Sequence, residues 1–177
     1  KEFSVELADE SSFKELKNLV ERTFKVKFTD KQKKENEMTV TQLHYQNWPD
    51  HGVPDIEEAF YYYDYMFNKV SKVESANIPT VVHCSAGVGR TGTFMSSYSL
   101  WLSITNRYFE LKSKPKKIEV SDTKIENNIE NLNIHKSLDF SFSVFRTVMK
   151  VKDCRCYSVQ NSVQYEFIYS FLLKLFG

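Results

Sequence analysis

The glycines constrain this chain most, because three of its five lie within one short segment, at positions 87, 89 and 92. Glycine adopts positive φ at little steric cost. A chain this poor in glycine therefore needs a sharply turning loop at this segment. A β-branched run at 80–83 precedes the loop, and an apolar periodicity from Thr91 follows it. The pattern predicts a buried strand, a tight loop and a helix, in that order.

The loop carries side chains suited to binding an anion, in the order His83-Cys84-Ser85-Ala86-Gly87-Val88-Gly89-Arg90-Thr91. Its backbone N–H groups can form a cradle, and the following helix adds its positive dipole end. Arg90 can hold two phosphate oxygens in a planar fork. Helix N-termini and cations lower a cysteine pKa. We therefore expect Cys84 to be a thiolate at neutral pH, with Thr91 bonded to the sulfur and His83 bracing the loop.

Two simpler interpretations of Cys84 stay open, a buried structural cysteine in a tight turn and a zinc ligand. A Cys and an Arg six positions apart arise by chance in a chain with 24 basic residues. A zinc site needs further ligands at chelating spacing. Cys154 and Cys156 have no His near them in the sequence. We expect no metal.

A second proline- and glycine-marked segment, 48–54, lies upstream of the loop. Its prolines stiffen both ends, and Gly52 permits a sharp turn. Asp50 could then swing over a site as part of one unit, with Trp48 as the hinge anchor. The leaving oxygen of a phosphate ester needs a proton, and a placed general acid contributes about 10²–10⁴-fold. A turn that caps the next helix also fits this local sequence.

Gln160 and Gln164 give a weaker signal. They are four residues apart at the start of an expected helix, so both can face one way. Amides can hold a water molecule without competing as nucleophiles. Polar residues at a helix N-terminus are ordinary, so the pair indicates little by itself.

Hydrophobic periodicity predicts the remaining elements. Alternating residues at 3–7, 24–28 and 38–45 predict antiparallel strands with one wet face, joined by a charged hairpin loop at 29–37. Residues 11–20 fit either a short helix or an irregular excursion. The same periodicity predicts four amphipathic helices, each with one buried face. In chain order, the buried faces are formed by Ile56, Phe60, Tyr63, Phe67 and Val70; by Phe94, Tyr98, Trp101 and Thr105; by Val144, Val148 and Val151; and by Tyr165, Ile168, Tyr169 and Leu172.

Composition narrows the class of protein. The net charge of +1 favours neither nucleic acid nor an anionic membrane as a partner. No window is long and apolar enough to span a bilayer. Three cysteines without framework spacing favour a reducing compartment. Lys1 is neither an initiator Met nor part of a signal peptide, so we expect a piece of a longer chain.

Segment 112–137 differs from the rest of the sequence. It is rich in Lys and Asn and carries only scattered Ile and Leu. Loops beyond about 12–15 residues are unusual inside compact domains. We expect a disordered insertion here.

Taken together, the motifs resemble those of the tyrosine-specific protein phosphatases, a cysteine-dependent family. Segment 83–92 is similar to the family's signature loop, and 48–54 is similar to its mobile acid loop. Gln160, within 157–165, lies where the family's glutamine loop would be. The order of the three motifs matches, and the similarity covers nearly the whole chain except 112–137.

The resemblance implies an α/β (α+β) fold, a twisted mixed β-sheet flanked by helices with a strand, phosphate loop and helix at its core. It also implies that residues 1–177 are the larger, C-terminal part of a catalytic domain. The family's upstream part carries the loop that recognises phosphotyrosine. Neither a cofactor nor a metal is implied.

The resemblance further implies hydrolysis of phosphotyrosine in proteins. Cys84 would be the nucleophile that forms a phosphocysteine, Asp50 the general acid and then base, and Gln160 the residue that positions water. Arg90 would clamp the phosphate and Thr91 would assist the sulfur. The substrate-binding set would be Ser85, Ala86, Gly87, Val88, Gly89, Arg90, Asp50, Gln160 and Gln164, supported by His83 and Trp48. The partners would be phosphotyrosine-containing proteins, with a role in signalling. The chain would be cytoplasmic, either by itself or as a cytoplasmic region of a membrane protein.

Two other functions use the same loop. A phosphotyrosine-binding pseudophosphatase would need a changed Cys84, Arg90 or Asp50, and all three are present. An enzyme for phosphoinositides or phosphoserine would have a more basic or shallower pocket. Ala86 and Val88 are apolar, which disfavours an inositide headgroup.

Overall fold

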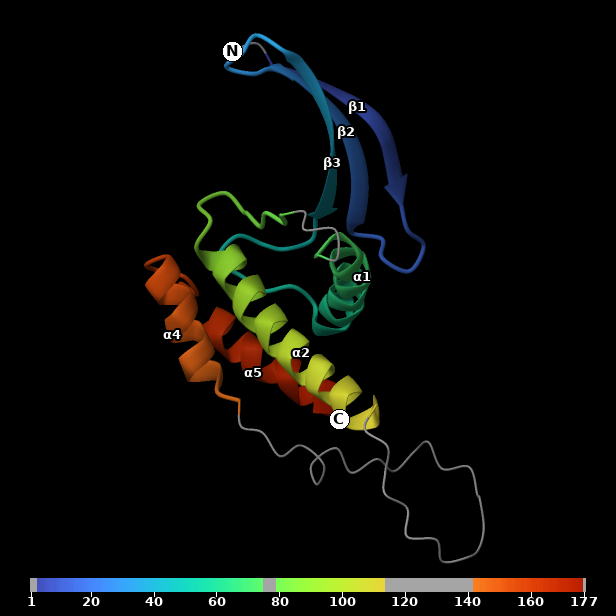
Figure 1. Ribbon diagram of the computed structural model, residues 1–177. Helices are drawn as coiled ribbons and strands as arrows, with labels where there is room; N and C mark the ends of the chain where they lie inside the picture. The colour runs from blue at the N-terminus through green and yellow to red at the C-terminus, as the bar shows by residue number, and fades with distance from the viewer. Residues whose placement is uncertain (1–2, 75–78, 114–141, 177) are drawn as a thin grey trace, which may run out of the picture. The chain divides into compact units, whose positions relative to one another are not determined.

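The computed structural model describes residues 3–74, 79–113 and 142–176. The chain forms two compact units, 1–78 and 79–177. The elements of the first unit are β1 (Phe3–Ser12), β2 (Leu19–Thr29), β3 (Glu35–Tyr45) and α1 (Ile56–Glu74), and those of the second are α2 (Gly89–Ser113), α4 (Val144–Cys154) and α5 (Ser162–Phe176) (Figure 1). The predicted α/β class is confirmed.

The three strands form an antiparallel sheet in the order β1-β2-β3. Alternating residues pair across it, with Val5 opposite Val26 and Phe24 opposite Val40. Apolar side chains therefore share one face of the sheet. The strands are longer than predicted. Residues 11–12 and 19–20 of the undecided segment belong to β1 and β2, and β3 begins at Glu35, so the hairpin loop predicted at 29–37 is only 30–34.

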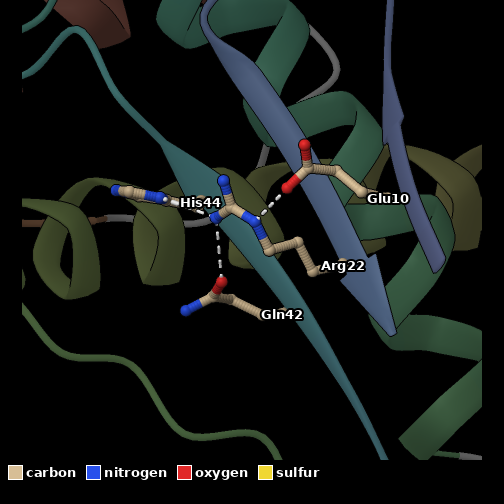
Figure 2. Close-up of polar contacts among 4 residues, drawn as sticks. All are labelled: Glu10, Arg22, Gln42 and His44. Carbon is tan, nitrogen blue, oxygen red and sulfur yellow. Dashed lines mark hydrogen bonds and ion pairs between the residues drawn. The ribbon is translucent and has the colours of Figure 1, made fainter. Parts of the chain in front are cut away.

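Arg22 on β2 joins all three strands (Figure 2). Its Nε donates to the carboxylate of Glu10 on β1. Its Nη1 donates to Oε1 of Gln42 at 3.2 Å and lies 3.1 Å from Nδ1 of His44, both on β3. Exposed ion pairs contribute little stability singly. The cluster nevertheless holds the last residues of β3 against β2, and β3 leads into segment 48–54.

Glu58 fastens helix α1 to the sheet. The helix begins at a capping Asp55, whose Oδ1 accepts from the Glu58 amide at 3.0 Å. The Glu58 carboxylate accepts from the Tyr45 hydroxyl at the end of β3 and from Asn18 Nδ2 at 2.7 Å. These hydrogen bonds, the one from Tyr45 above all, lower the pKa of Glu58. One carboxylate thus joins the helix, the end of β3 and the β1–β2 connection.

The buried face of α1 differs from the predicted one. Its buried side chains are Ala59, Tyr62, Tyr63 and Met66. Of the predicted face only Tyr63 is fully buried, while the side chains of Ile56, Phe60 and Phe67 are partly buried and that of Val70 lies outside the described set. Apolar residues surround this helix, so their spacing could not select one face. Tyr62 is fixed by its ring contact with Tyr45, at 5.4 Å between centroids.

The second unit packs α2 against α4 and α5. Most of the predicted faces of α2 and α4 is confirmed, since Phe94, Tyr98, Trp101, Val144 and Val148 are buried. The other two predicted residues, Thr105 and Val151, are only partly buried. The face of α5 is only partly as predicted. Ile168 and Leu172 are buried with Gln164, Phe167 and Phe171, whereas Tyr169 is 46% exposed. The stacked rings of Trp101 and Phe171, 6.0 Å apart, join α2 to α5.

The strand predicted at 80–83 does not form. Residues 79–84 have no regular structure, and Val81 is 82% exposed. A strand needs a neighbour for its backbone groups, and no described strand, all of which come from 3–45, pairs with 80–83. The described strand pairs are therefore all antiparallel. The predicted insertion 112–137 begins inside α2, and its residues 114–137 lie outside the described part of the chain.

Substituting Glu58→Gln should lower the free energy of unfolding by about 1–2 kcal/mol, because hydrogen bonds to charged groups are lost or weakened. A lowered carboxyl pKa stabilises the folded state above the unfolded pKa, about 4.3 for Glu. The difference between the two proteins should therefore decline as pH falls below that value and vanish below the lower pKa of Glu58 in the folded state. Urea denaturation at several pH values measures it.

Glu57→Gln is the matched control. Glu57 is exposed on the same helical turn, so this change removes the same charge near the helix N-terminus. Equal losses for the two variants would show that the contacts of Glu58 to Tyr45 and Asn18 do not carry the effect.

Candidate active site

The loop predicted from the glycines wraps around the sulfur of Cys84. Helix α2 begins at Gly89, two residues before the predicted start at Thr91. Gly87 has φ +70, the left-handed conformation that favours glycine. Its N–H donates to Cys84 Sγ at 3.2 Å. The positive φ of Gly87 thus accompanies an amide that points at the sulfur.

The surroundings of Cys84 stabilise the thiolate. Partial burial alone would raise the pKa of the Cys84 thiol, but hydrogen bonds outweigh it. They come from the hydroxyl and amide of Thr91 and from the amides of Gly87 and Val88, and they lower the pKa to about 7. The lowered pKa favours the thiolate at neutral pH.

Two neighbouring side chains fold back onto the same loop. Arg90 lies in the first turn of α2, and its Nη2 donates to Ser85 Oγ at 2.9 Å. His83 Nδ1 lies 3.3 Å from the carbonyl oxygen of Cys84. A guanidinium and a helix N-terminus thus meet at one loop, an arrangement that can bind a dianion.

Residues before α5 pack directly on the loop. The amide of Val159 donates to the Val88 carbonyl at 3.2 Å. A Cβ on Gly92 would lie 2.7 Å from Val159 N and 2.8 Å from Ser158 Cβ, so only glycine allows this approach. Val159 has φ 56, which is strained for a β-branched residue. The strained turn carries the chain into Gln160.

Gln160 lies beside the start of α2. A Cβ on Gly89 would lie 2.3 Å from Gln160 Oε1, so the amide covers that glycine. Gln164 is fully buried, and its side-chain Oε1 accepts a hydrogen bond from the backbone N–H of Gln160 at 2.8 Å. The backbone N–H of Gln164 donates to Asn161 Oδ1 at 2.9 Å. These two reciprocal hydrogen bonds resemble a capping box at the start of α5. Gln164 therefore also stabilises the N-terminus of this helix, a role that its spacing from Gln160 did not indicate.

Segment 48–54 forms a closed turn in the first unit. Trp48 Nε1 donates to the Gly52 carbonyl at 3.0 Å, and the Gly52 amide donates to the Pro49 carbonyl at 3.1 Å. The edge of the Trp48 ring meets Tyr45, with 6.5 Å between centroids. Trp48 thus anchors the turn, and Asp50 is exposed on it.

The predicted residues therefore fall into two groups. Cys84, its loop, Arg90, Thr91, Gln160 and Gln164 lie together in the second unit, whereas Asp50 and Trp48 lie in the first. Sequence reasoning missed Arg155, whose Nη2 donates to the Ala86 carbonyl at 2.9 Å. A single Arg between two cysteines gives no signal of such a contact. No group of three His, Cys, Asp or Glu side chains suited to a metal occurs among the described residues.

Comparisons with known proteins point in one direction. The family model described as protein-tyrosine phosphatase matches residues 1–174. Tyrosine-protein phosphatase 99A of Drosophila melanogaster is 46% identical over 81 residues, which cover 42% of this chain and 6% of that protein. Receptor-type tyrosine-protein phosphatase eta of Homo sapiens is 45% identical over 65 residues, 37% of this chain and 5% of that protein.

A third relative comes from a slime mould. Tyrosine-protein phosphatase 1 of Dictyostelium discoideum is 35% identical over 80 residues, 43% of this chain and 15% of that protein. The matched segments are thus a small part of each relative. They cover from 5% of the human protein to 15% of the Dictyostelium one.

Because Gly92 packs closely on residues 158–159, replacing it with alanine should destabilise the protein, opposite to the usual effect of Gly→Ala in a helix. Gly→Ala inside a helix ordinarily stabilises by about 0.8–1 kcal/mol. At Gly92 the new methyl group meets backbone atoms, and overpacking costs about 1–3 kcal/mol. Gly92→Ala should therefore lower the free energy of unfolding, as measured by urea denaturation.

Gly89→Ala provides the comparison. Its methyl group meets mainly the far end of the exposed Gln160 side chain, which can swing away. The Nε2 atom of the buried Gln164 would also lie 3.1 Å from that methyl group. Gly89→Ala should still cost less stability than Gly92→Ala, and adding Gln160→Ala should relieve the part of the cost that comes from Gln160. A Gly92→Ala protein as stable as the original would show that the packing of 158–159 on α2 is loose.

Proposed function

From the premise that this chain belongs to the protein-tyrosine phosphatase family, we propose that it hydrolyses phosphotyrosine in proteins through a phosphocysteine on Cys84. The observation that carries the proposal is the lowered pKa of the Cys84 thiol, about 7, inside a loop of inward-pointing amides. A thiolate is the nucleophilic form of cysteine. The same amides suit the oxygens of a bound phosphate.

The proposed reaction has two steps. Cys84 attacks phosphorus, so an S–P bond forms while the bond to the tyrosine oxygen breaks, and Asp50 gives that oxygen its proton. A water molecule then attacks the phosphocysteine. The new O–P bond forms, the S–P bond breaks, and Asp50 takes the proton of the water. Tyrosine and inorganic phosphate leave, and the thiolate is restored.

The other residues hold charge and water in this scheme. Arg90 and the loop amides of 85–89 stabilise the equatorial oxygens in both steps. Thr91 stabilises the sulfur when it leaves. Gln160, with Gln164 behind it, positions the attacking water. Segments 48–54, 83–92 and 157–165 thus serve as acid loop, signature loop and glutamine loop, and the scheme uses neither a metal nor a cofactor.

The proposed setting is signalling on the cytoplasmic side of a membrane. The names of the eta relatives describe receptor-type phosphatases. Among the described residues, no helix has the length and apolar character needed to cross a bilayer. The partners in this proposal are phosphotyrosine-containing proteins.

Phosphate release from matched peptides tests the function. One peptide carries phosphotyrosine, and a second carries phosphoserine at the same position. We expect release from the first alone, and none from either peptide with Cys84→Ser. Binding of the phosphotyrosyl peptide without release would indicate a pseudophosphatase, and equal rates on both peptides would overturn the tyrosine assignment.

Asp50→Ala should slow turnover of the phosphotyrosyl peptide by about 10²–10⁴-fold, because the leaving oxygen loses its proton donor. Binding of the peptide to the signature loop should persist, since that loop is unchanged. Steady-state kinetics and peptide affinity of the Cys84→Ser and Asp50→Ala/Cys84→Ser proteins measure the two effects. Asp64→Asn, an exposed carboxylate change on α1, is the charge-matched control. Unchanged turnover in Asp50→Ala would remove Asp50 from the mechanism.

A further inference from the structure

Arg155 meets the signature loop from the side opposite the sulfur. It is the C-cap residue that directly follows α4, and its Nη2 donates to the Ala86 carbonyl at 2.9 Å. Its guanidinium also lies against Gly87. A Cβ on that glycine would be 3.4 Å from Nη2, 3.5 Å from Nε and 3.6 Å from Cζ. The guanidinium thus covers the outer surface of the loop at its left-handed turn.

The carbonyl that Arg155 binds belongs to the same peptide unit as the amide on the sulfur. The peptide between Ala86 and Gly87 is planar, so its C=O and N–H point in opposite directions. Its oxygen accepts from Arg155, and its N–H donates to Cys84 Sγ at 3.2 Å. A contact that fixes the carbonyl therefore also fixes the direction of the N–H. A cation on the oxygen further polarises the peptide and strengthens its donor.

The backbone of Arg155 is itself held from both sides. Its amide donates to the Val151 carbonyl at 3.0 Å, at the end of α4. Its own carbonyl accepts from Ser158 Oγ at 2.7 Å. Ser158 is buried in the segment that packs on Gly92. The position of the guanidinium is thus set by the junction of α4 and the glutamine loop.

We propose that Arg155 is a positioning residue, which orients and polarises the Ala86–Gly87 peptide so that its N–H holds the Cys84 sulfur as a thiolate. The proposal rests on the proposed function, because it assigns Arg155 to the nucleophile of that reaction. Arg155 acts through the peptide and needs no contact with the substrate.

The remaining groups around the sulfur predict the size of the effect. The hydroxyl and amide of Thr91 and the amide of Val88 also lower the pKa of the Cys84 thiol, and they stay in place without Arg155. Arg90 keeps its own contact with Ser85. Loss of Arg155 weakens one donor among several. We expect Arg155→Met to raise the pKa of Cys84 by about 0.5 to 1.

The test measures alkylation of Cys84 by iodoacetamide against pH in the full chain. Mass spectrometry of peptides separates Cys84 from Cys154 and Cys156. Arg155→Met should shift the half-point of the Cys84 rate upward, and Arg155→Lys should restore part of the shift. Turnover of the phosphotyrosyl peptide should fall most below pH 7 and recover as pH rises, whereas a merely structural loss lowers it at every pH.

Arg146→Met is the matched control for charge. Arg146 is exposed in the first turn of α4, nine residues before Arg155 and therefore roughly 13 Å from it along the helix axis. Its loss changes the net charge equally but leaves the loop untouched, so the half-point for Cys84 should stay within error of the original. Equal shifts for the two variants would overturn the proposal in favour of a general charge effect. Urea denaturation of each variant verifies that it is folded.

Two outcomes separate this proposal from the proposed function. A half-point near 7 in the original protein with no shift in a folded Arg155→Met protein overturns the role of Arg155 alone. A half-point at the ordinary cysteine value, about 8.5, in the original protein overturns the proposed function as well.

Discussion

One interaction governs the second unit of this chain, the binding of the Cys84 sulfur by amides of the loop that follows it. Burial opposes the thiolate, and the hydrogen bonds from Thr91, Gly87 and Val88 reverse that effect. Those donors converge only because Gly87 adopts a left-handed conformation and α2 begins directly after the loop. The charge on the sulfur is therefore a property of backbone geometry more than of neighbouring charged side chains.

The rest of the second unit keeps that geometry rigid. Two glycines of α2 admit the segment before α5, one beside Val159 and the other beneath the Gln160 amide. A backbone hydrogen bond from Val159 to Val88 closes the contact. Behind it, the buried rings of Trp101 and Phe171 tie α2 to α5. The backbone of the nucleophile's loop and that of the proposed water-holding glutamine are thus parts of one packed body, although the exposed Gln160 side chain can still move.

The sequence predicted features that depend on local chemistry. The clustering of glycines predicted the position of the loop, and the helical spacing of Phe94, Tyr98 and Trp101 predicted the buried face of α2. Features set by distant contacts escaped it. The strand at 80–83 lacks a described partner, aromatic residues all around α1 concealed which face packs, and Arg155 reaches Ala86 across many residues of sequence. The residues and the chemistry of the loop could therefore be predicted from the sequence, whereas the residues that pack around the loop could be identified only from the structure.

Trapping the covalent intermediate tests the central claim most directly. The protein is mixed with a phosphotyrosyl peptide, quenched rapidly in acid, and digested for mass spectrometry. The mechanism predicts that the peptide containing Cys84 gains the mass of one phosphoryl group, and that Gln160→Ala increases this population by slowing its hydrolysis. Phosphate release without any phosphoryl group on Cys84 would contradict the claim that this sulfur is the nucleophile.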